Sequence, residues 1–251
     1  MDRWSGKVAV VSGASSGIGE AICIDLVSHG VIVVGLARRL DRLKELSTKL
    51  GKDKFHPIEC DVTKEECILK AFTWTEKHLG GVDILVNNAG VANAGPIIDT
   101  STDEYRKVID TNLIAPAICA REAIQSMKKR NVHGHVININ SIAGQFSEAL
   151  HIPIGMYAPS KYGLRALGTE LRHEIIKAGL KVKISNISPG AVETEMIANF
   201  KKLPVKFSML KAKDISDAVI YVLGTPSSVE IPEVTIMPQN EIIGIPTGLT
   251  G

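Results

Sequence analysis

The chain has 251 residues, of which 45% are hydrophobic, and both values are typical of one globular α/β domain. Its 29 basic and 27 acidic residues leave a formal net charge of +2, so the charge balance does not indicate a nucleic-acid partner. No apolar run reaches the roughly 18 residues that a membrane span requires. We therefore expect no stable membrane insertion.

The four cysteines form no Cys-x-x-Cys pair and no cluster with histidine at zinc-ligand spacing. This pattern predicts free thiols in a reducing compartment and no metal site. The first predicted strand begins at residue 7, which leaves no room for a signal peptide after Met1. A cytoplasmic location is therefore expected.

Apolar runs of strand length alternate with segments of helical periodicity along the chain. The expected strands cover 7–11, 31–36, 55–60, 84–86, 135–140, 182–187 and 234–237. The expected helices cover 17–29, 40–50, 63–78, 101–111, 115–130, 156–177 and 214–223. Thr63 is the expected N-cap of the third helix, and the helical pattern leaves room for a kink at Asn112.

Repeated alternation of strand and helix predicts a parallel sheet with helices on both faces. Right-handed crossovers then give a single-domain, doubly wound Rossmann fold of about seven strands, spanning residues 1–251. The tail after Pro238 is expected to be loosely ordered.

The first strand leads into a glycine-rich turn, SGASSGIG at 12–19, and then into a helix. Glycines at such a turn let a pyrophosphate approach the backbone, and the helix N-terminus attracts its charge. The spacing is GxxxGxG rather than GxGxxG, and a glycine-rich turn alone is also compatible with an ordinary strand–helix loop. The strand and helix around it favour dinucleotide binding, with these candidate ligands: Gly13, Ser15, Ser16, Gly17, Ile18 and Gly19.

The second strand ends in Arg38 and Arg39 rather than in an acid. An NAD-binding protein usually has Asp or Glu here to bind the ribose 2′-hydroxyl, whereas guanidinium groups suit a 2′-phosphate. The nearest acid, Asp41, falls inside the next predicted helix. The arginines could also be a solvated start to that helix, but the preceding turn favours NADP(H) as the cofactor.

Tyr157 is followed four residues later by Lys161, which places both on one face of a helix. Hydride transfer to or from a carbinol carbon also needs a proton moved at the oxygen. A phenol is a poor base at neutral pH, and a nearby ammonium lowers its pKa. Ser141 ends the fifth strand, where its hydroxyl can bond a substrate oxygen. An isolated YxxxK would be read as helix surface, but here it follows the dinucleotide turn, Asn112 and Ser141 in order.

Together these segments resemble the short-chain dehydrogenase/reductase family over nearly the whole chain. The resemblance implies that Tyr157 is the acid/base and that Lys161 tunes its pKa and binds the nicotinamide ribose. It implies that Ser141 positions the substrate oxygen and that Asn112 holds a water of the proton relay. The remaining implied cofactor ligands are Asp61 and Val62 at the adenine, Asn88 at the adenosine ribose, and Val192 and Thr194 at the nicotinamide and phosphates.

Two features depart from the family pattern. Ser12 replaces a usual threonine and keeps the hydroxyl. The interval between Ser141 and Tyr157 is a few residues longer than the family's, and the added segment, 145–155, should border the substrate pocket.

The family resemblance also implies a substrate lid at 191–213. Apolar residues there and in the added segment suggest an extended hydrophobic pocket, although they could equally pack the lid down. The interleaved lysines fit a solvated face. The apolar residues are Leu150, Ile152, Ile154, Met196, Ile197, Phe200, Leu203, Val205, Phe207, Met209 and Leu210.

Segments such as VSGASSGIG, GLARR and CDVT are most similar to the dehydrogenase/reductase member 11 type, nearest an insect branch that includes NADP-dependent farnesol dehydrogenases. This implies a hydrophobic alcohol or carbonyl substrate, with farnesol or a related isoprenoid alcohol as the specific expectation. The alternatives are a steroid or general carbonyl reductase, a non-catalytic NADP-binding protein, and an acyl-carrier-protein reductase. The family also implies a homodimer or homotetramer built through 115–130 and 156–177.

Overall fold

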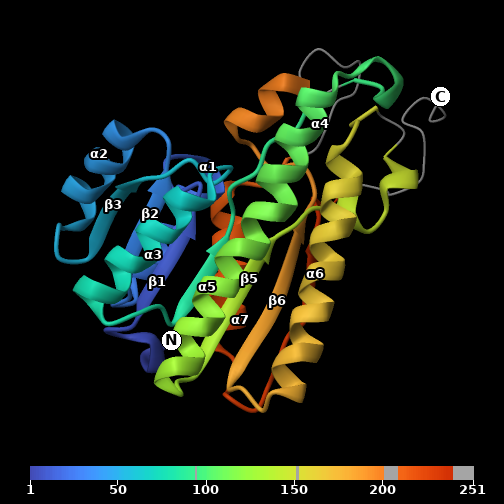
Figure 1. Cartoon of the computed structure of the whole chain (residues 1–251). Coiled ribbons are helices and arrows are strands. Elements are labelled where there is room, and N and C mark those ends of the chain that lie inside the picture. The colour runs from blue at the N-terminus through green and yellow to red at the C-terminus, as the bar shows by residue number, and fades with distance from the viewer. Residues whose placement is uncertain (94, 151–152, 201–208, 240–251) are drawn as a thin grey trace.

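The computed structural model describes residues 1–93, 95–150, 153–200 and 209–239. Seven parallel strands form one sheet in the order β3-β2-β1-β4-β5-β6-β7. Helices cover both faces of the sheet, so the molecule has three layers (Figure 1). The predicted doubly wound fold in a single domain is confirmed. The tail prediction falls on 240–251 and lies outside the described residues.

The elements alternate along the chain as expected. The strands are β1 (Val8–Ser12), β2 (Ile32–Ala37), β3 (Phe55–Glu59), β4 (Ile84–Asn87), β5 (Gly134–Ile139), β6 (Val182–Pro189) and β7 (Glu233–Ile236). The helices are α1 (Gly17–Ser28), α2 (Leu40–Leu50), α3 (Glu65–Leu79), α4 (Thr102–Ile109), α5 (Ala115–Arg130), α6 (Tyr157–Lys177) and α7 (Ala212–Gly224).

The central strand β1 is apolar on both sides because the sheet is covered on both faces. Ala9 and Val11 belong to the core beneath α1, α2 and α7. Val8 and Val10 point the other way, into the core beneath α3, α5 and α6. Successive side chains of a strand alternate between faces, so a continuous apolar run serves two cores at once.

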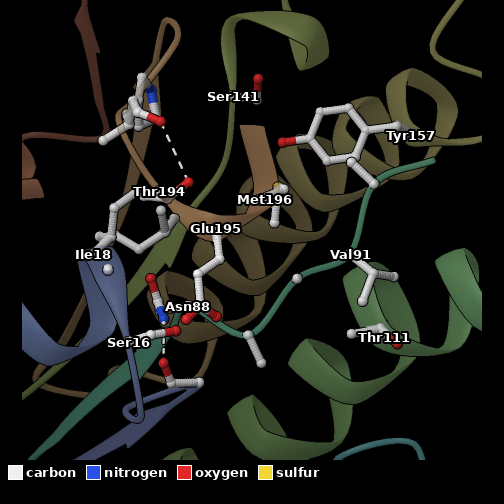
Figure 2. A pocket seen from close by; sticks show the side chains of 18 of the residues that line it. Ser16, Ile18, Asn88, Val91, Thr111, Ser141, Tyr157, Thr194, Glu195 and Met196 are labelled. Carbon is white, nitrogen blue, oxygen red and sulfur yellow. Dashed lines mark hydrogen bonds between the residues drawn. The ribbon is translucent and has the colours of Figure 1, made fainter. Parts of the chain in front are cut away.

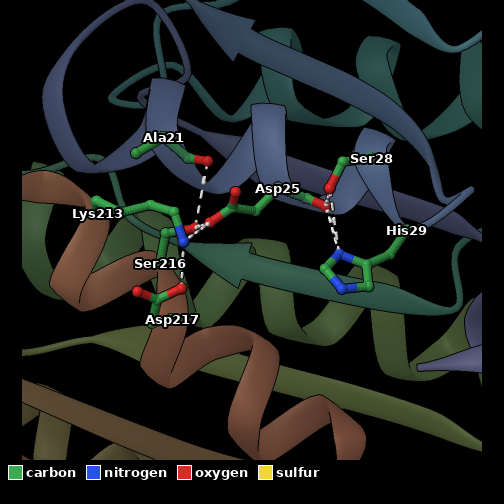
Figure 3. Close-up of polar contacts among 7 residues, drawn as sticks. All are labelled: Ala21, Asp25, Ser28, His29, Lys213, Ser216 and Asp217. Atoms are coloured by element: carbon green, nitrogen blue, oxygen red, sulfur yellow. Dashed lines mark hydrogen bonds and ion pairs between the residues drawn. The ribbon is translucent and has the colours of Figure 1, made fainter.

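Helices α1 and α7 are joined by a polar cluster as well as by apolar packing (Figure 3). The mostly buried Asp25 carboxylate accepts a hydrogen bond from the Ser216 hydroxyl at 2.5 Å and lies 3.3 Å from the Lys213 ammonium. This cluster fixes α7, which follows the predicted lid, to the helix that begins at the glycine-rich turn.

Three buried asparagines form a ladder across the middle of the sheet. Asn87 on β4 donates to Asn138 on β5, and Asn138 donates to Asn186 on β6, each at 3.0 Å. The three residues are direct partners in the strand register. A Cβ atom at Gly168 of α6 would lie 2.8 Å from the Asn186 amide, so α6 approaches the ladder closely through a glycine.

Two local expectations need correction or refinement. The third helix begins at Glu65 after Lys64, not at Thr63, so Thr63 is not its N-cap. The Thr63 backbone N–H and hydroxyl instead donate to the Asp61 carboxylate, which draws the residue into a turn before the helix. At Asn112 the structure shows a π-helical turn, Asp110–Ile114, that joins α4 to α5.

Among the described residues, no helix has both the length and the apolar character needed to cross a bilayer. The four cysteines are free thiols, and burial raises the pKa of Cys60 and of Cys119 to about 12.

Candidate active site

A groove runs along the carboxyl edge of the sheet and opens into a cavity of about 780 Å³. Its walls come from the glycine-rich turn, from the ends of β4, β5 and β6, and from the start of α6 (Figure 2). The chain crosses over in opposite directions from β1 and from β4, which are neighbours in the sheet. Doubly wound folds bind ligands at such a point.

The glycine-rich turn has no room for a side chain at Gly13 or Gly19. A Cβ atom at Gly19 would lie 2.3 Å from the Gly13 carbonyl oxygen, and one at Gly13 would lie 2.9 Å from the backbone of Ala89. Gly13 and Gly17 also have positive φ angles of 67° and 57°. Ser16 precedes α1, but its hydroxyl accepts a bond from Arg39 instead of capping the helix. The first turn of α1 therefore has no side-chain cap and lines the cavity, where such a helix N-terminus fits a phosphate.

Asn88 and Ser12 brace this turn from behind. The Asn88 amide donates to the carbonyls of Ser12 at 2.9 Å and Gly13 at 3.2 Å. The Ser12 hydroxyl accepts from the backbone N–H groups of Asn88 and Ala89, each at 3.0 Å. The hydroxyl kept at position 12 thus joins β1 to the end of β4. Asn88 lines the groove, as expected, with its amide nitrogen already engaged in the turn.

Arg39 reaches across the opening of the groove with all three guanidinium nitrogens bonded. Nε donates to the Ser15 hydroxyl at 3.2 Å, and Nη2 donates to the Ser16 hydroxyl at 2.6 Å. Nη1 donates to one carboxylate oxygen of Glu195 at 2.7 Å. The other oxygen of Glu195 accepts from Arg42 at 2.6 Å. Hydrogen bonds from Arg42 and Arg39 lower the pKa of Glu195 to about 2.

Arg42 and Glu195 were missed by the sequence reasoning. Arg42 had a signal, because it lies one helical turn after Arg39 and can reach the same anion. Glu195 had none, because it meets Arg42 across 153 residues of chain. Arg38 lines the groove, as expected.

Asp61 and Val62 line the groove beside the arginines, as expected for an adenine pocket. Burial alone would raise the pKa of Asp61, but hydrogen bonds from Thr63 and the charge of Arg38 outweigh it and lower that pKa. The Asp61 carboxylate is thus held charged in a fixed turn.

Tyr157 and Lys161 lie one turn apart at the start of α6 and line the same cavity as Arg39. Figure 2 shows the Tyr157 hydroxyl directed into the cavity between Ser141 and Met196. The Lys161 ammonium donates to the Ile139 carbonyl at 2.9 Å and lies 5.7 Å from the centre of the Tyr157 ring. Gly144 lets the turn after Ser141 pack closely against α6, because a Cβ atom at this position would lie 2.7 Å from the Lys161 backbone.

Burial governs the ionisation of this pair. It raises the pKa of Tyr157, and a hydrogen bond with the Ser141 side chain opposes the rise. Burial also lowers the pKa of Lys161 to about 8. The ligand-free site therefore favours a neutral phenol beside an ammonium that loses its proton more readily than an exposed lysine does.

Asn112 occupies the π-helical turn with its side-chain amide fully engaged. The amide donates to the Val91 carbonyl at 2.9 Å and to the Ser160 hydroxyl at 3.0 Å. Its oxygen accepts from the Val91 N–H at 2.9 Å. The side chain has no free amide proton, so a water of the proposed relay would have to bind elsewhere on this residue. The side chain itself fixes the loop after β4 to α6.

Val192 and Thr194 follow β6 and lie against the start of α1. Val192 is buried, and the Thr194 methyl group lies 3.1 Å from the position of a Cβ atom at Gly17. The backbones of Ala191, Glu193 and Leu210 are joined by two hydrogen bonds of 2.8 Å. We call 191–197 and 209–210, which these bonds connect, the lid base.

The expected apolar residues Leu150, Ile154, Met196 and Ile197 line the cavity. Met209 is about half exposed and Leu210 packs against the core beneath α1 and α7, so these two do not belong to the pocket. Ala143, Ile154 and Ala158 form a small buried cluster against which Leu150, Tyr157 and Ile197 pack. The expected residues Ile152, Leu203, Val205 and Phe207, and the side chain of Phe200, lie outside what the structure describes. The added segment is tied to β7, because Gln145 accepts a hydrogen bond from Thr235 at 2.9 Å.

Comparison with known proteins agrees with this geometry. The model of the short chain dehydrogenase family matches residues 7–203. The chain belongs to the short-chain dehydrogenase family. A farnesol dehydrogenase of Aedes aegypti is 45% identical over 246 residues, covering 96% of this chain and 99% of that protein. Dehydrogenase/reductase SDR family member 11 of Homo sapiens is 38% identical over 255 residues, covering 96% and 98%.

A solved structure described as the closed form of serine dehydrogenase complexed with NADP⁺ has a TM-score of 0.83 and 30% identity. The alignment covers 94% of this chain and 96% of that one. The resemblance seen in the sequence is therefore confirmed. This short-chain dehydrogenase is an oxidoreductase with a groove at the carboxyl edge of its sheet and an adjoining apolar cluster.

Proposed function

We propose that the chain is an NADP(H)-dependent oxidoreductase that moves hydride between the nicotinamide and a hydrophobic alcohol or carbonyl, with farnesol or a related isoprenoid alcohol as substrate. One observation carries the choice of NADP(H). Arg39 and Arg42, which follow β2, both pair with the carboxylate of Glu195. A site that holds a carboxylate between two guanidinium groups is suited to a phosphate, whose oxygens they bind in the same way.

The residues present fit such a cofactor. The glycine-rich turn and the start of α1 would hold the pyrophosphate, and the arginines the 2′-phosphate. Asp61 and Val62 would flank the adenine, while Val192 and Thr194 would meet the nicotinamide carboxamide and phosphates. Asn88 would support the adenosine ribose through the turn that it braces. When bound, the nicotinamide accepts or supplies the hydride.

Tyr157 would move the proton at the substrate oxygen. Because burial raises its pKa, the phenol is protonated at neutral pH and suited to donate during carbonyl reduction. Ser141 would hold the same oxygen by a hydrogen bond. Lys161, one helical turn along, would stabilise the phenolate left behind and bind the nicotinamide ribose. Proton return from solvent would pass through a water near Asn112, bound by its main chain because its amide is engaged.

The apolar wall supports a hydrophobic substrate. Leu150, Tyr157 and Ile197 pack against the buried cluster that contains Ile154, so the wall beside Tyr157 is apolar. The relationship to a farnesol dehydrogenase supports an isoprenoid alcohol within that class. The lid at 191–213, the homodimer or homotetramer and the cytoplasmic location stay predictions.

A spectrophotometric assay tests the proposal. Purified protein is mixed with NADP⁺ or NAD⁺ and with farnesol, geraniol or ethanol, and formation of the reduced cofactor is followed. We expect the highest kcat/KM with farnesol and NADP⁺. Equal use of NAD⁺ would contradict the cofactor assignment. Turnover only of steroids or small ketones in the reductive direction would favour the alternative, a carbonyl reductase. No turnover of any of these compounds would contradict the proposed enzymatic function.

A further inference from the structure

Glu195 occupies an unusual position for an acid, because it lies at the opening of a groove built for anions. Its two carboxylate oxygens bind different arginines, Arg39 at 2.7 Å and Arg42 at 2.6 Å. Figure 2 shows its side chain reaching from the lid base toward Ser16 and Asn88. The contact joins the lid base to the helix after β2.

Each guanidinium nitrogen of Arg39 already has one partner. Nε and Nη2 bind the Ser15 and Ser16 hydroxyls, and Nη1 binds Glu195. The two terminal nitrogens each keep one further N–H, so a phosphate that binds there lies close to the Glu195 carboxylate on the same guanidinium. Glu195 is the partner that a phosphate would also repel, because both are anionic.

We propose that Glu195 is a specificity-determining residue for the dinucleotide, whose carboxylate stands in for the 2′-phosphate until NADP(H) displaces it. This inference rests on the proposed use of NADP(H). A dinucleotide without the 2′-phosphate has no group that competes for the arginines and leaves Glu195 in place. Glu195 therefore weakens binding of NADP(H) and leaves binding of NAD(H) unchanged.

The displacement also reaches the substrate side of the cavity. Glu195 begins a short 3-10 turn, Glu195–Phe200, that contains Ile197 of the apolar wall. On its other side, Thr194 lies against Gly17 at the start of α1. When the 2′-phosphate releases Glu195, this turn loses its ion pairs with the arginines and becomes free to move over the substrate.

The size of the effect follows from exposure. The three side chains are each about half exposed, and exposed ion pairs contribute little individually. Without Glu195, a 2′-phosphate no longer has to displace two such pairs or approach a carboxylate. Affinity for a ligand with a 2′-phosphate should therefore rise about two- to tenfold.

Isothermal titration calorimetry of Glu195→Gln measures how Glu195 affects binding of the 2′-phosphate, apart from binding of the rest of the cofactor. The probes are adenosine 2′,5′-bisphosphate, which has the 2′-phosphate without nicotinamide, and 5′-AMP, which has neither. We expect the variant to bind the bisphosphate about two- to tenfold more tightly than the wild type and 5′-AMP within twofold. The matched control is Glu193→Gln, which removes the same charge from the same loop and should change neither affinity.

Unchanged or weaker bisphosphate binding by Glu195→Gln, or equal tightening by Glu193→Gln, would overturn the inference. The wild type tests the proposed function separately. If it binds NAD⁺ as tightly as NADP⁺, the cofactor proposal fails. If it prefers NADP⁺ but Glu195→Gln does not tighten the bisphosphate, only the role of Glu195 fails.

Hydrogen exchange tests the link to the lid base. Adenosine 2′,5′-bisphosphate should speed amide exchange at 193–197 in the wild type, whereas 5′-AMP should not. In Glu195→Gln, exchange should already be fast without ligand. Slower or unchanged exchange with the bisphosphate in the wild type would contradict release of this turn.

Discussion

Two parts of the site are held by different kinds of interaction: the floor, formed by the proposed catalytic residues Asn112, Ser141, Tyr157 and Lys161, and the lid base. The Lys161 ammonium and the Asn112 amide are buried and bind main-chain carbonyls. Glu195 of the lid base is 57% exposed and pairs with arginines that are 42% and 47% exposed. Salt and water screen the second set and hardly reach the first. The residues proposed for proton transfer are thus held by buried bonds, whereas those proposed for cofactor recognition are held by exposed ion pairs that can exchange partners.

Replacing the phenol of Tyr157 in the floor should have the largest effect on activity. Tyr157→Phe removes the group that moves the proton, so kcat should fall by about 10³-fold while the Kd for NADP⁺ stays within about twofold. Steady-state kinetics and calorimetry measure the two values. Tyr162→Phe, a more exposed tyrosine of the same helix that bonds Glu148, is the control and should retain activity. Activity of Tyr157→Phe within tenfold of wild type would remove Tyr157 from its proposed role.

The buried ammonium should cost stability as well as support the reaction. A pKa lowered from 10.5 to about 8 corresponds to about 3 kcal/mol against folding with Lys161 charged. Lys161→Met removes this cost but leaves the Ile139 carbonyl without its donor, which costs about 1–3 kcal/mol. At pH 7 the variant should therefore be inactive and about as stable as the wild type, or more so.

The pH dependence gives the sharper test of Lys161. Between pH 8 and pH 10.5 the unfolded chain still binds the proton that the folded protein has lost, so wild-type stability rises with pH. Relative to Lys161→Met, the wild type should gain about 3 kcal/mol over this interval, measured by urea unfolding at several pH values. Parallel stability curves for the two proteins would show that Lys161 is not held in a costly buried charge state.

A methyl group in the phosphate turn should have a smaller effect. Gly19→Ala places a carbon 2.3 Å from the Gly13 oxygen, and relief of this overlap should destabilise the fold by about 1–3 kcal/mol. The turn must shift, so NADP⁺ binding should weaken about tenfold. Gly224→Ala, where the structure shows open space, is the control and should change neither quantity much. Normal NADP⁺ affinity in Gly19→Ala would argue against a phosphate in this turn.

Truncation in the lid base should give the smallest effect. Ile197→Ala removes apolar contact from the substrate wall, so kcat/KM for farnesol should fall about fivefold to tenfold. Turnover of a short alcohol and the Kd for NADP⁺ should not change. An equal fall for both alcohols would show that Ile197 supports the fold rather than the hydrophobic substrate.

The positions of the residues in the floor follow from local patterns in the sequence. The glycine-rich turn, the YxxxK offset and the strand ends of this chain each reside in one short segment, and the sheet brings their ends together. Bond partners were harder to foresee. The pattern placed Asn112 at a break in a helix, but not its bonds to Val91 and Ser160.

The contacts of the lid base could not be predicted from local sequence patterns. Arg39 and Arg42 are separated from Glu195 by more than 150 residues, and their contact depends on how the segment after β6 turns back over the groove. Neither hydrophobic periodicity nor helix propensity bears on that turn. Thr63 failed as an N-cap for a related reason, since the nearby Asp61 carboxylate offered its N–H and hydroxyl a stronger partner.

The asparagine ladder has a consequence for how the protein is made. During synthesis α6, with Tyr157 and Lys161, leaves the ribosome before β6, which supplies Asn186. Until then Asn138 has no acceptor on that strand, and an unpaired buried amide costs about 1–3 kcal/mol. Gly168 also lacks the amide against which it packs. We therefore expect the nascent chain to keep its catalytic helix loosely docked until residue 186 has emerged, so that an incomplete chain does not assemble a working proton donor.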